Sequence, residues 1–257
     1  MTDVVATTRP SARTLAPGRR DDRGDDEEAT VDTSGQGDWS GPLYAAMLLA
    51  TLVATQPALG NPLLWLRRPR AAAVGLWLAV AVPSLVELAW HPVYDALSRR
   101  PDLIRDGQLW RLLTSVTVQD GGLSGTVSNL VWFAVLAPLA VHLWGPKRAL
   151  ALFVAGVVAF NALTTWVFPS PGGGNSAAMF FLMATTTALL VVRRPHPLPI
   201  VMAALVAAIG VVLIVRDDAH GLVMLGGLVV GGAVAALWPP RQVPDARSVT
   251  RIAPART

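Results

Sequence analysis

Apolar residues are gathered in a series of blocks along the chain, separated by short breaks rich in proline, glycine and arginine. Each block approaches the length of about 20 residues that a helix needs to cross about 30 Å of hydrocarbon. The blocks cover residues 42–59, 71–90, 125–144, 149–168, 176–192, 198–215 and 219–238. The pattern therefore predicts an all-α polytopic membrane protein.

The first of these blocks is short and interrupted. Residues 42–59 contain Gln56 and Pro57, so this stretch either spans the bilayer or lies at its interface. We expect it to form an extra N-terminal transmembrane helix, ahead of a membrane domain that covers residues 71–238.

Both ends of the chain are polar. Residues 1–41 hold few apolar residues, and their charge is separated into an arginine-rich part and a later acidic run, a composition typical of disorder. Because this segment lacks an apolar core region, it does not read as a signal peptide. Residues 239–257 are expected to form a polar C-terminal tail.

Composition supports the membrane assignment and excludes several kinds of chemistry. Hydrophobic residues make up 53% of the chain and charged residues only 15%, more apolar than a soluble domain needs. Cysteine is absent, which excludes disulfides, thiolate metal sites and cysteine catalysis. The net charge is +4, but the basic residues lie at the ends of apolar blocks and form no stripe with aromatics. We therefore expect no nucleic-acid partner.

The basic residues also predict an orientation. If successive blocks alternate in direction, Lys147, Arg193 and the arginines of the C-terminal tail fall on one side of the membrane, whereas residues 169–175 on the other side carry no lysine or arginine. The positive-inside rule makes the first side cytoplasmic. We expect a multi-pass protein of the plasma membrane, with its C-terminus in the cytoplasm and the long connection 91–123 outside.

Two residues at the outer depth could carry chemistry. Ser176 opens an apolar block directly after a glycine-rich stretch, and His220 stands near the start of the last block, at the same predicted depth. A neutral imidazole can take the proton of a serine hydroxyl and return it to a leaving amine. Plainer alternatives stay open, because Ser176 could only cap its helix and His220 could be an interfacial residue held by a backbone carbonyl.

Other polar residues at this depth allow two interpretations each. Asn129 could donate to a developing oxyanion or could tie two helices together. Asp217 and Asp218 could orient His220, although capping the last helix is the more common role. Glu87 is expected to reach the interface or to pair with an arginine.

Taken together, these residues resemble the rhomboid family of intramembrane serine proteases, over roughly residues 71–238. That family has six core helices, a long outer first loop with a Trp-Arg pair, a Gly-x-Ser-Gly motif that opens the fourth helix, and a histidine near the outer end of the sixth. The matching residues are Trp110, Arg111, Asn129, Gly174, Ser176, Phe180 and His220.

The resemblance implies roles for these residues. Ser176 and His220 would be the catalytic dyad, and Asn129 would contribute to the oxyanion site. Phe180 stands in the place of the aromatic residue that packs beside the catalytic histidine. Gly174 belongs to the nucleophile motif, and the Trp-Arg pair belongs to the first loop.

The chain also departs from the family pattern. Ala177 replaces the glycine that follows the nucleophile, and Gly125 stands where the family has a histidine four residues before Asn129. One oxyanion donor is thereby lost. The histidines usual in the first loop are also absent, with Gln119 and Asp120 in that region.

The resemblance implies a rhomboid-like six-helix core and an endopeptidase that cleaves transmembrane or juxtamembrane segments of membrane proteins. Its partners would be the lipid bilayer and transmembrane substrates or clients, and no cofactor or metal is implied. The alternative is a catalytically weak or inactive pseudoprotease that binds client transmembrane helices. A small-molecule transporter fits less well, because intramembrane charges are few and no internal repeat is evident.

Overall fold

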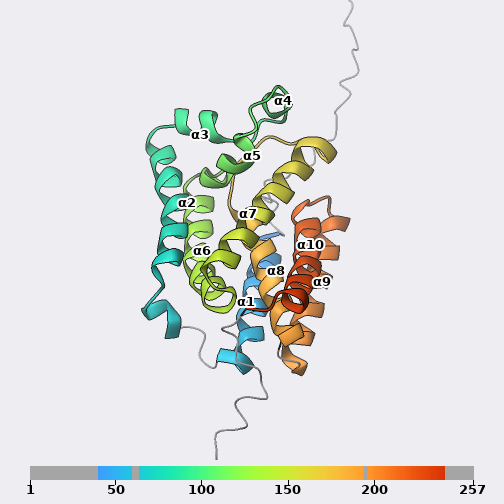
Figure 1. The fold of residues 1–257 in the computed structure, drawn as a ribbon. Coiled ribbons are helices and arrows are strands. Elements are labelled where there is room, and N and C mark those ends of the chain that lie inside the picture. The colour runs from blue at the N-terminus through green and yellow to red at the C-terminus, as the bar shows by residue number, and fades with distance from the viewer. Residues whose placement is uncertain (1–39, 60–63, 194–195, 241–257) are drawn as a thin grey trace, which may run out of the picture. The chain divides into compact units, whose positions relative to one another are not determined.

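The computed structural model describes residues 40–59, 64–193 and 196–240. Within this part of the chain, seven helices are long and apolar enough to cross a membrane (Figure 1). They are α1 (Ser40–Leu59), α2 (Ala71–Ala89), α6 (Gly122–Trp144), α7 (Pro146–Ala162) with its π-helical continuation η3 (Leu163–Val167), α8 (Ser176–Arg193), α9 (Pro197–Val215) and α10 (His220–Leu237). The predicted all-α polytopic fold, six core helices with an extra helix ahead of them, is confirmed.

The helix ends follow local sequence signals. Gly145, with a φ of +79°, separates α6 from α7, and Pro146 occupies the first turn of α7. Glycine tolerates this conformation, and proline fits a helix start because it needs no amide acceptor there. Helix α1 continues through Pro57 without a break. The predicted disordered segment 1–41 lies almost entirely outside the described residues, as does most of the tail 239–257.

The connection between α2 and α6 is built from short helical turns. These are α3 (Pro92–Leu97), α4 (Pro101–Arg105), α5 (Arg111–Thr114) and η2 (Ser115–Thr117), and a further short turn, η1 (Leu64–Arg67), precedes α2. The guanidinium of Arg111 is buried and donates to the carbonyl oxygens of Asp95 at 2.9 Å and Ser98 at 2.8 Å. These bonds tie α5 to α3 and to the strand-like segment that follows it.

Helix α8 is the centre of the bundle. Most of its residues are buried, and it packs against α1, α6, α7, α9 and α10. Two neighbours approach closely through glycines: a Cβ built on Gly156 of α7 would lie 2.8 Å from the Phe181 Cβ, and one on Gly227 of α10 would lie 2.8 Å from the Phe181 carbonyl oxygen. Small residues allow such close backbone approach between membrane helices.

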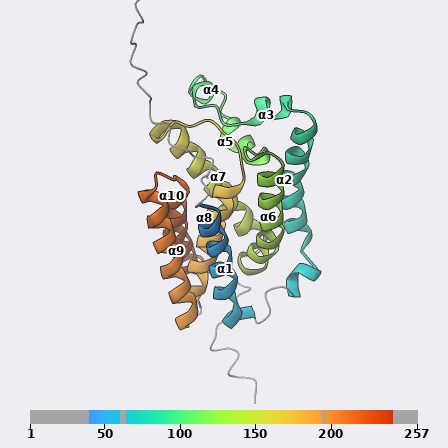
Figure 2. The ribbon, with the colours of Figure 1, turned by 180° about the vertical axis from the view of Figure 1, so that it is seen from behind.

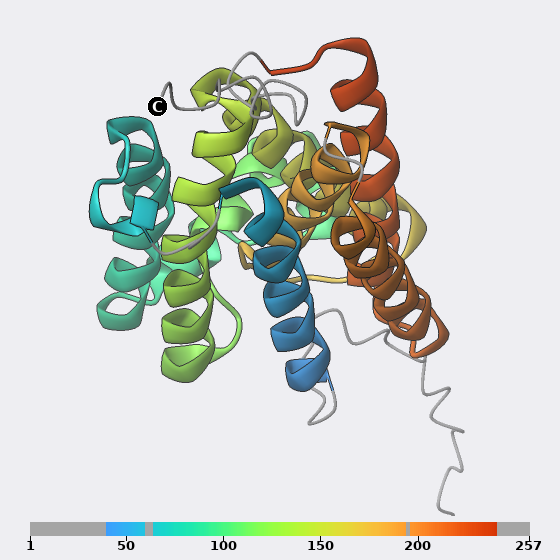
Figure 3. The same ribbon diagram turned by 90° about the horizontal axis from the view of Figure 1, so that it is seen from below.

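The extra helix α1 is part of this bundle. It packs against α8 and α9, and in Figures 2 and 3 it lies between α9 and α6. Thr51 and Thr55 of α1 are fully buried, and the hydroxyl of Thr187 on α8 donates to the Thr51 hydroxyl at 3.4 Å. The side chains near the start of α1, among them Tyr44, therefore reach the interior of the membrane domain.

Candidate active site

Ser176 and His220 meet at the starts of α8 and α10. The Ser176 Oγ lies 2.9 Å from the His220 Nε2, within hydrogen-bond reach. Ser176 is half-buried and His220 is only 2% exposed. Each residue is the first of its helix, and the close packing of α8 on α10 brings the two helix starts together. A nucleophile and a base in this relation can carry out acyl transfer.

The other ring nitrogen of His220 faces a carboxylate. Its Nδ1 lies 2.6 Å from the Asp218 Oδ1, which also accepts the backbone N–H of His220 at 2.9 Å. The N-cap residue of α10 is Ala219, and the Asp218 side chain accepts both the first amide of that helix and the ring N–H of His220. Asp217 is exposed. The alternative in which His220 is held by a backbone carbonyl is thus not what the structure contains.

A tyrosine of α1 completes this group. The Tyr44 hydroxyl donates to the Asp218 Oδ2 at 2.5 Å and lies 3.3 Å from the His220 Nδ1. Burial raises the pKa of Asp218, but the positive charge of protonated His220 and the hydrogen bonds from His220 and Tyr44 outweigh it and hold that pKa below its usual range.

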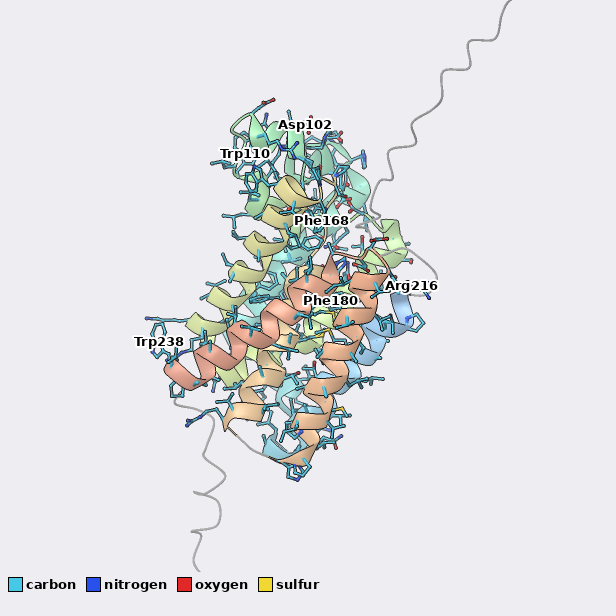
Figure 4. All side chains as sticks on the ribbon, turned by 90° about the vertical axis from the view of Figure 1, so that its right-hand side faces the viewer. Asp102, Trp110, Phe168, Phe180, Arg216 and Trp238 are labelled. Carbon is cyan, nitrogen blue, oxygen red and sulfur yellow. The ribbon has the colours of Figure 1, made fainter. Side chains whose placement is uncertain are left out.

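Three aromatic rings surround the imidazole. The centroid of the His220 ring lies 5.0 Å from that of Phe160 and 5.4 Å from those of Tyr44 and Phe180. Phe180 meets the imidazole edge-on and lies in the interior of the bundle (Figure 4). The rings restrict the rotation of His220 and exclude bulk water from its sides.

The glycine stretch before Ser176 takes conformations that other residues rarely adopt. Gly172 and Gly174 have φ values of +147° and +138°, and the Gly174 amide donates to the Ser115 carbonyl at 2.9 Å. The first helical bond of α8 runs from the Met179 amide to the Asn175 carbonyl at 3.0 Å. The amides ahead of Met179, from Ser176 onward, have no acceptor within their own helix, so they can stabilise negative charge.

A buried arginine holds this loop in place. Arg99 pairs with Gly172 through two backbone hydrogen bonds, of 2.6 and 2.9 Å. Its guanidinium donates to the Ser170 carbonyl at 2.8 Å and to the Asn161 side chain of α7 at 2.9 Å. Burial lowers the pKa of Arg99 to about 10, which still leaves it protonated at neutral pH.

A neighbouring carboxylate binds the same loop. Asp120 accepts the Gly173 amide at 2.7 Å and the hydroxyl of Tyr94. Burial raises the pKa of Asp120, and these two hydrogen bonds oppose the rise. Burial and the bond to Asp120 also raise the pKa of Tyr94.

Gln119 joins the loop before Ser176 to helices α2 and α6. Its side-chain amide donates to the Ser84 hydroxyl at 3.1 Å and to the Asn175 Oδ1 at 3.0 Å. Its Oε1 accepts from Asn129 Nδ2 at 2.8 Å, and its backbone amide donates to Glu87 at 2.9 Å. Asn129 is therefore tied to the connection between α2 and α6. The carboxylate of Glu87 is buried and accepts this amide, and within the described ranges no ion pair joins it to an arginine, so the expected pairing with an arginine is wrong.

A cavity of about 300 Å³ opens beside the serine and the histidine. Its polar lining includes Asn129, Ser128 and Asp120, and Gly125 forms part of the same wall. A Cβ built on Gly125 would meet no atom within 4 Å, so this position leaves open space. Among the residues that the structure describes, no group of three or more metal-ligating side chains could hold a metal ion.

The structure brings most of the predicted residues together. The cavity is lined by Asn129, Gly174, Ser176, Phe180 and His220. Trp110 and Arg111 do not line it: Trp110 is 53% exposed at one end of the helices (Figure 4), and Arg111 stabilises the connection between α2 and α6.

Three neighbours of the site were not assigned to it from the sequence. Tyr44 lies in an apolar block whose rotation about its axis the sequence does not reveal. For Asp218, the sequence favours capping of the last helix. Gln119 stands out in the sequence only as a departure from the rhomboid pattern of the first loop. Tyr44, the one tyrosine of the block 42–59, is a polar group near its start and could have drawn attention to that helix face.

Comparison with protein families gives one finding. Residues 106–241, more than half of the chain, match the model of the Rhomboid domain family. Comparison with the curated proteins gives no match. The matched range includes Ser176, His220 and the connection between α2 and α6 from Asp106 onward. The chain belongs to the rhomboid family.

Proposed function

We propose that the protein is an intramembrane serine endopeptidase that cleaves transmembrane or juxtamembrane segments of other membrane proteins. The observation that carries this proposal is the 2.9 Å contact between Ser176 Oγ and His220 Nε2, beside a partly polar cavity in a membrane domain. Hydrolysis needs water within the membrane domain, and a polar cavity can hold it.

The reaction follows from the positions of the groups. The Ser176 hydroxyl attacks the carbonyl carbon of the scissile peptide bond while the His220 Nε2 takes its proton. The carbonyl oxygen becomes negative and is stabilised by the amides at the start of α8. The side chain of Asn129 has two amide N–H groups, and one of them donates to the Gln119 Oε1. We propose that the second donates to the oxyanion.

The tetrahedral intermediate then collapses. His220 gives its proton to the leaving amine nitrogen, the carbon–nitrogen bond breaks, and the carbonyl stays bound to Ser176 as an ester. A water molecule attacks this ester and loses a proton to His220. His220 then gives that proton to the Ser176 oxygen as the carbon–oxygen bond of the ester breaks, and the second product leaves as a carboxylic acid. No metal or cofactor takes part in these steps.

The alternative function is that of a pseudoprotease that binds client transmembrane helices. The observation that favours it is Gly125, which leaves open space on the cavity wall where the family carries a donor side chain. The loss of one oxyanion donor costs about 10²–10³ in rate without abolishing catalysis. The peptidase proposal therefore stands unless the serine proves unreactive.

A fluorophosphonate probe, which reacts with activated serines, separates the two functions. We expect the purified protein to be labelled, and S176A and H220A to remain unlabelled. S128A is the matched control, because Ser128 lines the same cavity and carries a hydroxyl of the same kind. Absence of labelling in the wild type at every pH tested would favour the client-binding function.

We further propose that the protein lies in the plasma membrane with its C-terminus in the cytoplasm, because lysine and arginine occur in the short connections and the tail on that side, whereas the short connection 169–175 on the other side carries none. A reporter fused after Thr257 that is active only in the cytoplasm tests this orientation. A signal from the opposite side would place Ser176 and His220 at the inner face.

A further inference from the structure

We propose that Asp218 and Tyr44 are positioning residues for His220, and that the extra helix α1 is consequently part of the reacting centre. The inference rests on the proposed peptidase function, which uses only the serine and the histidine as reacting groups. It adds Asp218 to that dyad as a third member. It also adds Tyr44, which lies on a helix outside the six-helix core and holds Asp218 in place.

The reactivity of His220 depends on which of its two ring nitrogens carries the proton. A neutral imidazole carries one N–H, and the base needs a lone pair on the nitrogen that faces Ser176. The Asp218 Oδ1 lies 2.6 Å from Nδ1, and an ionised carboxylate can only accept a hydrogen bond. It therefore keeps the proton on Nδ1 and leaves the Nε2 lone pair directed at the Ser176 hydroxyl.

The carboxylate of Asp218 is held in a fixed position beside the imidazole. Asp218 is only 4% exposed, and both of its oxygens are engaged: Oδ1 accepts the backbone N–H and ring N–H of His220, and Oδ2 accepts the Tyr44 hydroxyl. A buried carboxylate with these partners cannot turn away from the imidazole without losing hydrogen bonds that water would not replace.

The packing of α1 fixes the position of Tyr44. Its ring stacks at an angle on Phe180 of α8, with centroids 4.6 Å apart, and α1 is fixed by its packing on α8 and α9. Tyr44 and Asp218 are 174 positions apart in sequence. Helix α1 thus supplies the hydroxyl that holds Asp218 beside His220. A change in how α1 packs would therefore change the reactivity of Ser176.

The experiment combines spectroscopy, which does not need activity, with labelling kinetics. Protein labelled with ¹⁵N-histidine in detergent micelles reports which ring nitrogen carries the proton, and comparison with H220A identifies the His220 signals among the four histidines. We expect the Nδ1–H form in the wild type. D218N, whose amide can donate to Nδ1, is expected to shift His220 toward the Nε2–H form.

The kinetic readout is the rate of fluorophosphonate labelling at Ser176. We expect D218N to lower it by at least about 10²-fold, since the equivalent change in a serine protease triad costs about 10⁴. Y44F keeps the ring on Phe180 and removes only the hydroxyl, and we expect a loss of about three- to tenfold, as for one hydrogen bond. D217N removes a carboxylate from the neighbouring exposed residue and should label like the wild type.

The outcomes separate the two proposals. An unchanged His220 tautomer in D218N, or labelling of D218N at the wild-type rate, would overturn the positioning role. If the wild type is not labelled but the tautomer changes in D218N and the Nδ1 signal moves in Y44F, the peptidase proposal fails while the positioning role stands. Should D218N fail to fold, an unmoved Nδ1 signal in Y44F would refute the role of α1.

Discussion

Gly231 of α10 lies directly against the backbone of Thr185 on α8. A Cβ built on this glycine would come within 2.4 Å of the Thr185 Cα and 2.7 Å of its carbonyl oxygen. The two helices approach this closely over Gly227 as well, so the space between their backbones is fixed by glycines. Because Ser176 and His220 start these helices, the same packing sets the distance between nucleophile and base.

The first prediction concerns this contact. G231A places a methyl group against backbone that cannot move independently, so we expect a loss of about 1–3 kcal/mol in stability and a lower melting temperature in detergent. The matched control is G232A, since a Cβ at Gly232 would meet nothing within 4 Å. There the gain in helix propensity predicts an unchanged or slightly higher melting temperature. Equal shifts in both variants would contradict the close-packing argument.

The second prediction uses the open space at Gly125. G125H adds a donor side chain to the cavity wall at the position where the rhomboid family carries histidine. We expect labelling of Ser176 to rise by up to about 10²-fold, because one oxyanion donor contributes about that much in a serine protease. G125A also replaces the glycine but adds no donor, so its labelling should stay at the wild-type rate. Equal rates in the two variants would argue against an oxyanion site at this wall.

The third prediction concerns the hydrogen-bond network of Gln119. Q119A removes the partner of Ser84, Asn129 and Asn175 at once. Buried groups left without a partner cost about 1–3 kcal/mol each, so we expect a lower melting temperature and slower labelling. Q108A removes a bond to Arg111 in the connection between α2 and α6, and neither residue lines the cavity. It should leave labelling unchanged, and slower labelling of both variants would mean that the effect is not specific to the site.

The fourth prediction is a pH dependence of stability. The pKa of Asp218 is lower in the folded protein than the ordinary 3.8, because hydrogen bonds and the charge of His220 outweigh burial. The resulting stabilisation is complete above pH 3.8 and is lost as the pH falls through the folded-state pKa. We expect the melting temperature of D218N to lie below that of the wild type at neutral pH. The gap should narrow below pH 3.8, and a gap that widens in acid would contradict this sign.

The fold could be predicted from the sequence in most of its elements, because a membrane helix is a local feature. The length and apolar character of each block decide whether it can span the bilayer, and Pro146 or Gly145 mark helix ends through backbone restrictions of their own. The four-residue spacing of Gly227 and Gly231 is likewise typical of close packing between membrane helices.

The serine, the histidine and their common depth were also available from the sequence, because depth follows from counting residues along spans of alternating direction. The direction in which each side chain points was not. It depends on the rotation of each helix about its axis, and contacts between helices far apart in sequence set that rotation.

The sequence alone determined a polytopic helical membrane protein with Ser176 and His220 at the same level. Only the tertiary structure decided that their side chains face each other, that Asp218 turns to the imidazole, and that Tyr44 of the first helix reaches this group. The physical reason is that burial in the bilayer acts on each block separately, whereas a hydrogen-bonded site needs several packed helices to present their polar atoms to one another within about 3 Å.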